Sequence, residues 1–134
     1  MNRFYLKVAR RAGKICEYCR APEIASNFLF EVEHIIPRSR EGKIELGNLA
    51  LACRSCNIFK SDYLNGIDEK GAEIARLFSP RRDVWHEHFR SNSETFEIER
   101  LTKIGCGTIN RLRLNSPLQI QARRQWHRLE LFPK

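Results

Sequence analysis

The sequence predicts an α+β fold in which two short strands and a helix are built into a cysteine frame. Two C-x-x-C pairs provide this frame: Cys16, Cys19, Cys53 and Cys56. Between the pairs, residues 28–34 alternate apolar and polar side chains, which is the pattern of a strand. Residues 49–53 are short and apolar enough for a second strand, and a helix is expected over residues 56–64. We therefore expect the order strand, loop, strand, helix in the first half.

Periodicity and helix-end signals predict the other elements. Apolar residues recur at helical spacing over residues 2–12, before a stop at Gly13. In the second half, the patterns predict helices over residues 69–78, 84–89 and 107–114, and a strand over residues 95–101. Asp68 and Asp83 are expected to cap the first two of these helices. The second half is thus expected to be mostly helical.

The last helix has the clearest start signal in the sequence. A cap, a proline at the first helical position and a capping-box partner follow one another: Ser116, Pro117 and Gln119. Apolar side chains then recur on one side of this helix: Leu118, Ala122, Trp126 and Leu129. Arginine residues surround that side: Arg123, Arg124 and Arg128.

The chain of 134 residues is long enough for one main core. We divide it into residues 1–66, which hold both cysteine pairs, and residues 67–134, a basic extension expected to pack on the first part. The formal net charge of +8 favours a polyanionic partner. No apolar run reaches the roughly 20 residues that a membrane span requires, so we expect a soluble cytoplasmic protein.

The four paired cysteines predict a structural zinc ion. Thiolates at about 2.3 Å suit tetrahedral zinc, and a closed set of four leaves no position for a catalytic water. Two C-x-x-C pairs in a reducing compartment favour metal binding over disulfides, and Cys106 stands apart from them. The 33 residues between Cys19 and Cys53 exceed the usual ribbon spacing of about 15 to 20. Something other than a simple ribbon is therefore inserted between the two pairs.

The insert contains residues suited to phosphodiester hydrolysis. Glu33 and Asn57 offer oxygen donors that a divalent ion such as Mg²⁺ accepts. His34 can act as a general base, because an imidazole with a pKa near 6.5 is largely neutral at physiological pH. The competing interpretations are a structural histidine, a helix cap at Asn57 and a turn residue at Asn48.

At these residues the sequence resembles the HNH endonuclease family. The matching pieces are C-x-x-C at 16–19, EHIIP at 33–37, GNLALACRSCN at 47–57, and Lys60. They occur in the right order over about half the chain, which is more specific than any single piece. The resemblance implies the ββα-metal (His-Me finger) fold and a metal-dependent DNA endonuclease. The basic second half resembles an extension of some small bacterial HNH proteins.

The resemblance also implies roles for individual residues. His34 would activate the attacking water, and Glu33 and Asn57 would hold a catalytic Mg²⁺ or Mn²⁺ ion. Asn48 would brace the loop and orient the histidine. Glutamate at position 33 departs from the aspartate found in many members, which bears on the choice of ion. Double-strand cleavage would require a homodimer or two successive nicks, because one such site cuts one strand.

Basic residues outside this motif are candidates for contact with nucleic acid, where they would add affinity without sequence information. The candidates are Arg38, Lys60, Arg81, Arg82, Arg123 and Arg124. Two other functions fit the same sequence. One is a zinc-ribbon module that binds nucleic acid without catalysis, and the other is the nuclease part of a larger targeted assembly.

Overall fold

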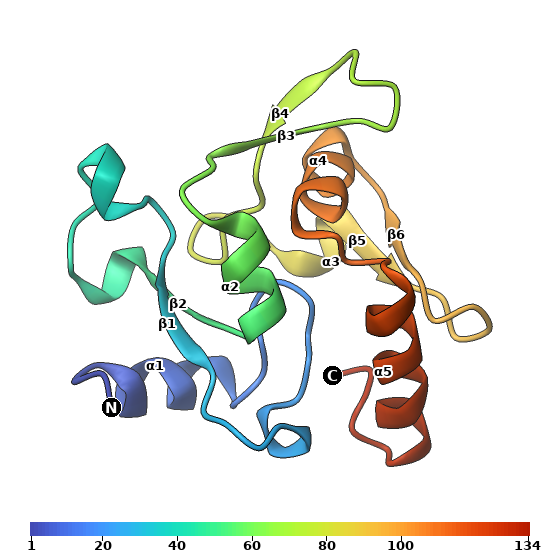
Figure 1. Ribbon diagram of the computed structural model, residues 1–134, viewed down its shortest axis with the longest axis horizontal. Helices are drawn as coiled ribbons and strands as arrows, with labels where there is room; N and C mark the ends of the chain where they lie inside the picture. Colours follow the sequence, from blue (N-terminus) through green and yellow to red (C-terminus); the bar gives the residue numbers. More distant parts are fainter.

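The computed structural model describes residues 1–134 and confirms the expected α+β fold. The chain begins with helix α1 (Tyr5–Ala12). An antiparallel hairpin of β1 (Glu31–His34) and β2 (Leu49–Ala52) follows, and helix α2 (Arg54–Lys60) comes directly after β2. Figure 1 shows α1 on one side of this hairpin and α2 on the other. The order strand, loop, strand, helix is that of a ββα-metal core.

The second half contributes two more hairpins and three helices. Strands β3 (Asn65–Ile67) and β4 (Ile74–Arg76) form one hairpin, and β5 (Phe89–Ser91) and β6 (Ile98–Arg100) form the other. The helices are α3 (Trp85–His88), α4 (Lys103–Leu112) and α5 (Pro117–Arg128). Strand β3 lies against α4 so closely that a Cβ on Gly66 would sit 2.0 Å from the carbonyl oxygen of Gly107. Neither glycine can therefore carry a side chain without moving the other element.

One hydrophobic core joins the two halves of the chain. It includes Val8 and Leu51 from the first half and Phe78, Phe89 and Leu112 from the second. The division of the chain at residue 66 stays a prediction; the core contains residues from both sides of it. None of the helices has the length and apolar character that a membrane span needs.

The helix predicted over residues 69–78 is wrong, because this segment forms the tip and second strand of the β3–β4 hairpin. The Asp68 carboxylate accepts a bond from the Ala72 backbone N–H at 2.9 Å, and Gly71 has a φ of +67°. Asp68 thus closes a turn, for which an aspartate is as well suited as for a helix cap. The capping signal was local and could not distinguish the two.

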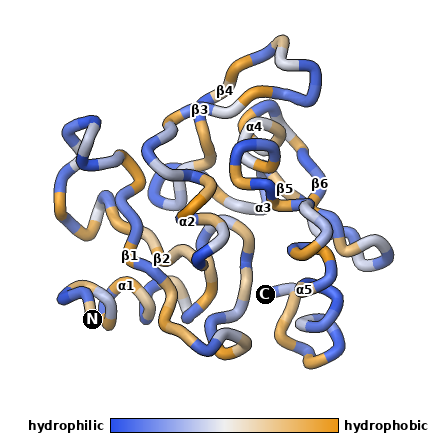
Figure 2. Tube along the Cα trace, in the orientation of Figure 1, coloured by the Kyte–Doolittle hydropathy of each residue, from blue (hydrophilic) through white to orange (hydrophobic).

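Helix α5 starts as predicted, since the Ser116 hydroxyl accepts a bond from the Gln119 backbone N–H. Its apolar side is not the buried one, because Leu118 and Leu129 are 78% and 64% exposed. The buried residues of α5 are instead Gln119 and Arg123. Figure 2 shows α5 largely in hydrophilic colours. A polar face therefore packs inward. Gln119 bonds Ser55 in the second C-x-x-C turn, and Arg123 bonds the carbonyl oxygens of Phe96 and Leu114.

Candidate metal centre and active site

The four paired cysteines converge in the interior. Their Sγ atoms all lie within 4.8 Å of one another, and all four residues are buried and free of disulfides. The Sγ atoms of Cys19 and Cys53 are 3.6 Å apart. A zinc tetrahedron with Zn–S bonds of about 2.3 Å has S–S edges of about 3.8 Å. The cluster therefore has the chemistry and the size of a four-cysteine zinc site.

Residues from the second half hold the two C-x-x-C turns from outside. Within the first turn, Glu17 forms an ion pair with Arg81, and the Tyr18 carbonyl accepts a bond from Trp85 Nε1 at 2.8 Å. Within the second turn, the Ser55 hydroxyl accepts a bond from Gln119 Nε2 at 3.3 Å. Both turns therefore depend on the extension for part of their support.

Arg123 lies one helical turn beyond Gln119 and is fully buried. Its guanidinium donates to the carbonyl oxygens of Phe96, at 2.6 Å, and of Leu114. Burial lowers the pKa of Arg123, and the negative charges of Cys19, Cys56 and Cys53 oppose this shift. The prediction that Arg123 contacts nucleic acid is wrong, because the side chain is enclosed within the fold.

Glu33 lies on β1 with its side chain directed toward α2, where it is only 5% exposed. Lys60 forms an ion pair with the carboxylate, and the Tyr18 hydroxyl donates to it at 2.7 Å. Burial raises the pKa of Glu33, and the charge of Lys60 opposes this shift. This carboxylate is therefore already engaged by two side chains.

Lys60 is 2% exposed and also donates to the carbonyl oxygens of His34, at 3.2 Å, and Ile35, at 2.9 Å. Its predicted contact with phosphate is wrong, since the ammonium group is surrounded by acceptors of the protein. Lys60 instead fixes the backbone at the end of β1, where His34 is located.

Asn48 closes the loop between β1 and β2. Its Nδ2 donates to the carbonyl oxygens of Ile36 and Lys43, both at 3.0 Å, and its Oδ1 accepts from the Ile36 backbone N–H at 2.8 Å. In addition, the Ile35 N–H donates to the Asn48 carbonyl at 2.9 Å. These bonds hold the residues that follow His34, which is the arrangement that a bracing role requires.

His34 is half-buried at the end of β1. Burial and then the charges of Arg38 and Lys60 lower its pKa. Its ring is therefore mostly neutral near pH 7, and its buried Nε2 has no hydrogen-bond partner in the fold. A neutral imidazole has one unprotonated ring nitrogen, which can accept a proton.

Asn57 faces Glu31 and not Glu33. Its Nδ2 donates to Glu31 Oε2 at 3.3 Å, and Arg54 on the same helix is 3.9 Å from Glu31. No hydrogen bond joins Asn57 to Glu33. Glu31 was missed as a site residue, although its position two residues before Glu33 on a strand places both side chains on the same face.

Residues 16–62 match the HNH endonuclease family. This segment is an HNH domain. It includes all four cysteines of the cluster, together with Glu33, His34, Asn48 and Asn57. No curated protein and no solved structure gives a significant match to the chain.

The arginines predicted to contact nucleic acid have different surroundings at the edges of the HNH domain. Arg81 is half-buried in its ion pair with Glu17. Arg38 and Arg82 are exposed, and Arg124 is exposed with its guanidinium 4.9 Å from the ring centre of Phe96. Of the six predicted residues, these three exposed arginines are the most accessible to a nucleic-acid phosphate.

The HNH domain also offers oxygen donors for a divalent ion. Glu31 and Asn57 meet across the β1–α2 contact, and Glu33 lies on the same face of β1. Carboxylate and amide oxygens suit Mg²⁺ or Mn²⁺ in chemistry. A divalent ion that used Glu33 would share this carboxylate with Lys60 and Tyr18 or displace one of them.

Proposed function

We propose that the protein is a metal-dependent endonuclease that hydrolyses DNA phosphodiester bonds, with His34 as the general base. The observation that carries the proposal is the state of His34 within the matched HNH segment. Its ring is half-buried at the end of β1, and its pKa is lowered, so that the imidazole is mostly neutral near pH 7. A base in this state can take a proton from a water molecule beside a bound phosphate.

The rest of the domain keeps His34 in position. Lys60 holds the His34 carbonyl, and Asn48 fixes the two residues that follow, so that the ring is carried by a constrained backbone. Arg38 is exposed near the ring and would attract the phosphate backbone of the DNA. These contacts orient the base and the substrate relative to each other.

Glu33 and Asn57, with Glu31 beside Asn57, would hold the divalent ion. When bound, this ion would neutralise charge on the scissile phosphate and on the departing 3′ oxygen. The products would be a 3′ hydroxyl and a 5′ phosphate. One HNH domain would cut one strand, so a double-strand break would require a homodimer, a larger assembly or a second nick.

The direct test is incubation of supercoiled plasmid with the protein and Mg²⁺ or Mn²⁺. We expect nicked circles to form before linear DNA. His34→Ala should lower the rate by about 10² to 10⁴, the usual contribution of a general base. His86→Ala, which removes an exposed histidine outside the domain, serves as the matched control and should keep the wild-type rate.

A second function is favoured by one observation. Glu33 is engaged by Lys60 and Tyr18, and Asn57 by Glu31, as in a domain that uses these residues only for structure. The alternative is a zinc-containing module that binds nucleic acid without cutting it. Equal nicking by the wild type and His34→Ala, or no nicking with either ion, would support this alternative and contradict the nuclease.

A further inference from the structure

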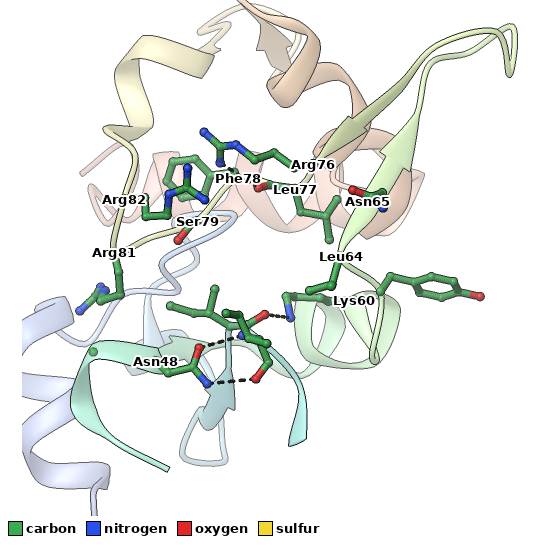
Figure 3. Close-up of a pocket in the computed structure, with 14 residues that line it drawn as sticks. Asn48, Lys60, Leu64, Asn65, Arg76, Leu77, Phe78, Ser79, Arg81 and Arg82 are labelled. Carbon is green, nitrogen blue, oxygen red and sulfur yellow. Dashed lines mark hydrogen bonds between the residues drawn. The ribbon is translucent and has the colours of Figure 1, made fainter. Parts of the chain in front are cut away.

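A pocket of about 390 Å³ lies between the HNH domain and the second half of the chain. Figure 3 shows Asn48 and Lys60 on the side of the HNH domain, with Arg76, Phe78 and Arg82 across from them. The volume is in the range of small-ligand sites, which is roughly 300 to 1,000 Å³. The pocket is thus large enough for a nucleobase with its sugar.

The walls of the pocket combine apolar surface with positive charge. Ile35, Ile36 and Leu64 provide the accessible part of the apolar surface, because Leu77 and Phe78 are only 6% and 3% exposed. No acidic residue lines the pocket. Its charged lining residues are all basic: Lys60, Arg76, Arg81 and Arg82. An occupant with one apolar, flat part and one anionic part complements both features. A nucleotide has these two parts.

Three of the four cations are fixed by acidic partners outside the lining. Arg76 forms a two-point ion pair with Asp83, with distances of 2.7 and 2.9 Å, and Arg81 pairs with Glu17. Lys60 pairs with Glu33. Arg82 is exposed, and its guanidinium has no hydrogen bond or ion pair within the protein. Arg82 is therefore the cation left for a phosphate at the mouth of the pocket.

The pocket is adjacent to the backbone that carries His34. Ile35 and Ile36, the next two residues, are part of its lining. Lys60, which lines it as well, binds the His34 carbonyl, and Asn48 binds Ile36 from the same side. An occupant would consequently lie beside the loop that positions the proposed base.

We propose that this pocket receives one unpaired nucleotide of the substrate strand, next to the bond that is cut. The base would lie against Ile36 and Leu64, and a phosphate would pair with Arg82. This inference rests on the proposed nuclease function and narrows it. A base that lies against these side chains has left the stack of a duplex, so the preferred substrate is a single strand or a duplex with a mismatch or flap.

The test measures binding and cleavage on the same labelled oligonucleotides. A single strand carries one abasic residue, which is moved along the sequence one position at a time. Fluorescence anisotropy without divalent ions gives the Kd, and gel analysis with Mn²⁺ gives kcat/KM. We expect the abasic residue to weaken binding about tenfold at one position and little elsewhere, as for loss of one base contact. A fully paired duplex should be cut at least tenfold less efficiently than the single strand.

Two variants connect the effect to the pocket. Ile36 is 47% exposed at the pocket, so Ile36→Trp should fill the space without disturbing the core and should abolish the dependence on abasic position. Arg82→Gln should weaken binding severalfold. Lys70→Gln removes one exposed charge from the tip of the β3–β4 hairpin and should have little effect.

Binding that is independent of abasic position in the wild type would overturn the pocket proposal, and so would equal position dependence in Ile36→Trp. Cleavage without position dependence would leave the nuclease intact and remove only the pocket. Position-dependent binding without cleavage would support the pocket and contradict the nuclease.

Discussion

The four-cysteine cluster and the surroundings of Glu33 both gather residues of ligand type, but they differ in what those residues contact. In the cluster, the four Sγ atoms all lie within 4.8 Å of one another. Around Glu33, the carboxylate is engaged by Lys60 and Tyr18, and the neighbouring Asn57 pairs with Glu31. The first site is complete as a set of ligands. At the second site, Glu33 and Asn57 would have to give up bonds to other side chains before they could bind an ion.

The largest expected effect concerns the cluster. Cys53→Ser should leave the chain largely unfolded, because zinc contributes roughly 10 kcal/mol to small zinc modules, which is comparable to the whole stability of a domain. Zinc content by atomic absorption and helix content by circular dichroism would show it. Cys106→Ser is the control and should retain one zinc ion and the native spectrum, since Cys106 lies outside the cluster. A folded, zinc-loaded Cys53→Ser protein would show that the four cysteines do not form one complete zinc site.

The next largest effect on stability is expected at Lys60, beside Glu33. Lys60→Met should lower the free energy of unfolding by about 3–5 kcal/mol, because Glu33 would remain buried without its cation. Adding Glu33→Gln should recover part of this loss, which urea titration of the zinc-loaded proteins would detect. If the double variant loses as much stability as the Lys60→Met and Glu33→Gln variants lose together, the ion pair is not what stabilises this region.

Arg123 tests whether a buried arginine holds the segments of the extension together. Arg123→Met should lower stability by about 2–3 kcal/mol, since carbonyl groups of Phe96 and Leu114 lose a charged donor. Arg124→Met, at the exposed neighbouring position, should change it by less than about 0.5 kcal/mol. A loss of DNA affinity in Arg123→Met with unchanged stability would restore Arg123 as a nucleic-acid contact.

Asp83 gives the smallest effect and a pH signature. Its bond from Arg76 lowers the pKa of Asp83 to about 2, from an unfolded value of 3.8. The stabilisation is therefore complete above about pH 4 and is lost as the pH falls through about 2. Asp83→Asn should cost about 1–2 kcal/mol at pH 7, since the half-exposed Arg76 reduces the effect, and little near pH 2. A difference between the two proteins that does not change with pH would contradict this assignment.

How much the sequence predicts differs between the two sites. The cysteine cluster could be predicted completely, because four ligands of one type at C-x-x-C spacing have one common way to converge. The order strand, strand, helix could also be predicted, since β1, β2 and α2 each have a local sequence pattern of their own. The partners of Glu33 could not be predicted from the sequence, because Lys60 is 27 residues away and its burial depends on how α2 crosses the hairpin.

The extension was the least predictable part. Arginines in a basic helix favour a solvated or DNA-binding surface, and nothing in the local sequence distinguishes Arg123 from Arg124. The difference arises from the bonds that Arg123 donates to the carbonyl oxygens of Phe96 and Leu114. Likewise, the β3–β4 hairpin depends on the contact between Gly66 and Gly107, which are 41 residues apart.

We propose that the HNH domain has a permanent zinc site and a separate, exchangeable ion site. Brief EDTA treatment of the zinc-loaded protein, with zinc content and plasmid nicking measured on the same sample, tests this proposal. We predict that nicking is abolished while one zinc ion per chain remains, and that Mg²⁺ or Mn²⁺ restores nicking. Activity that follows the zinc content and returns only with zinc would contradict the claim.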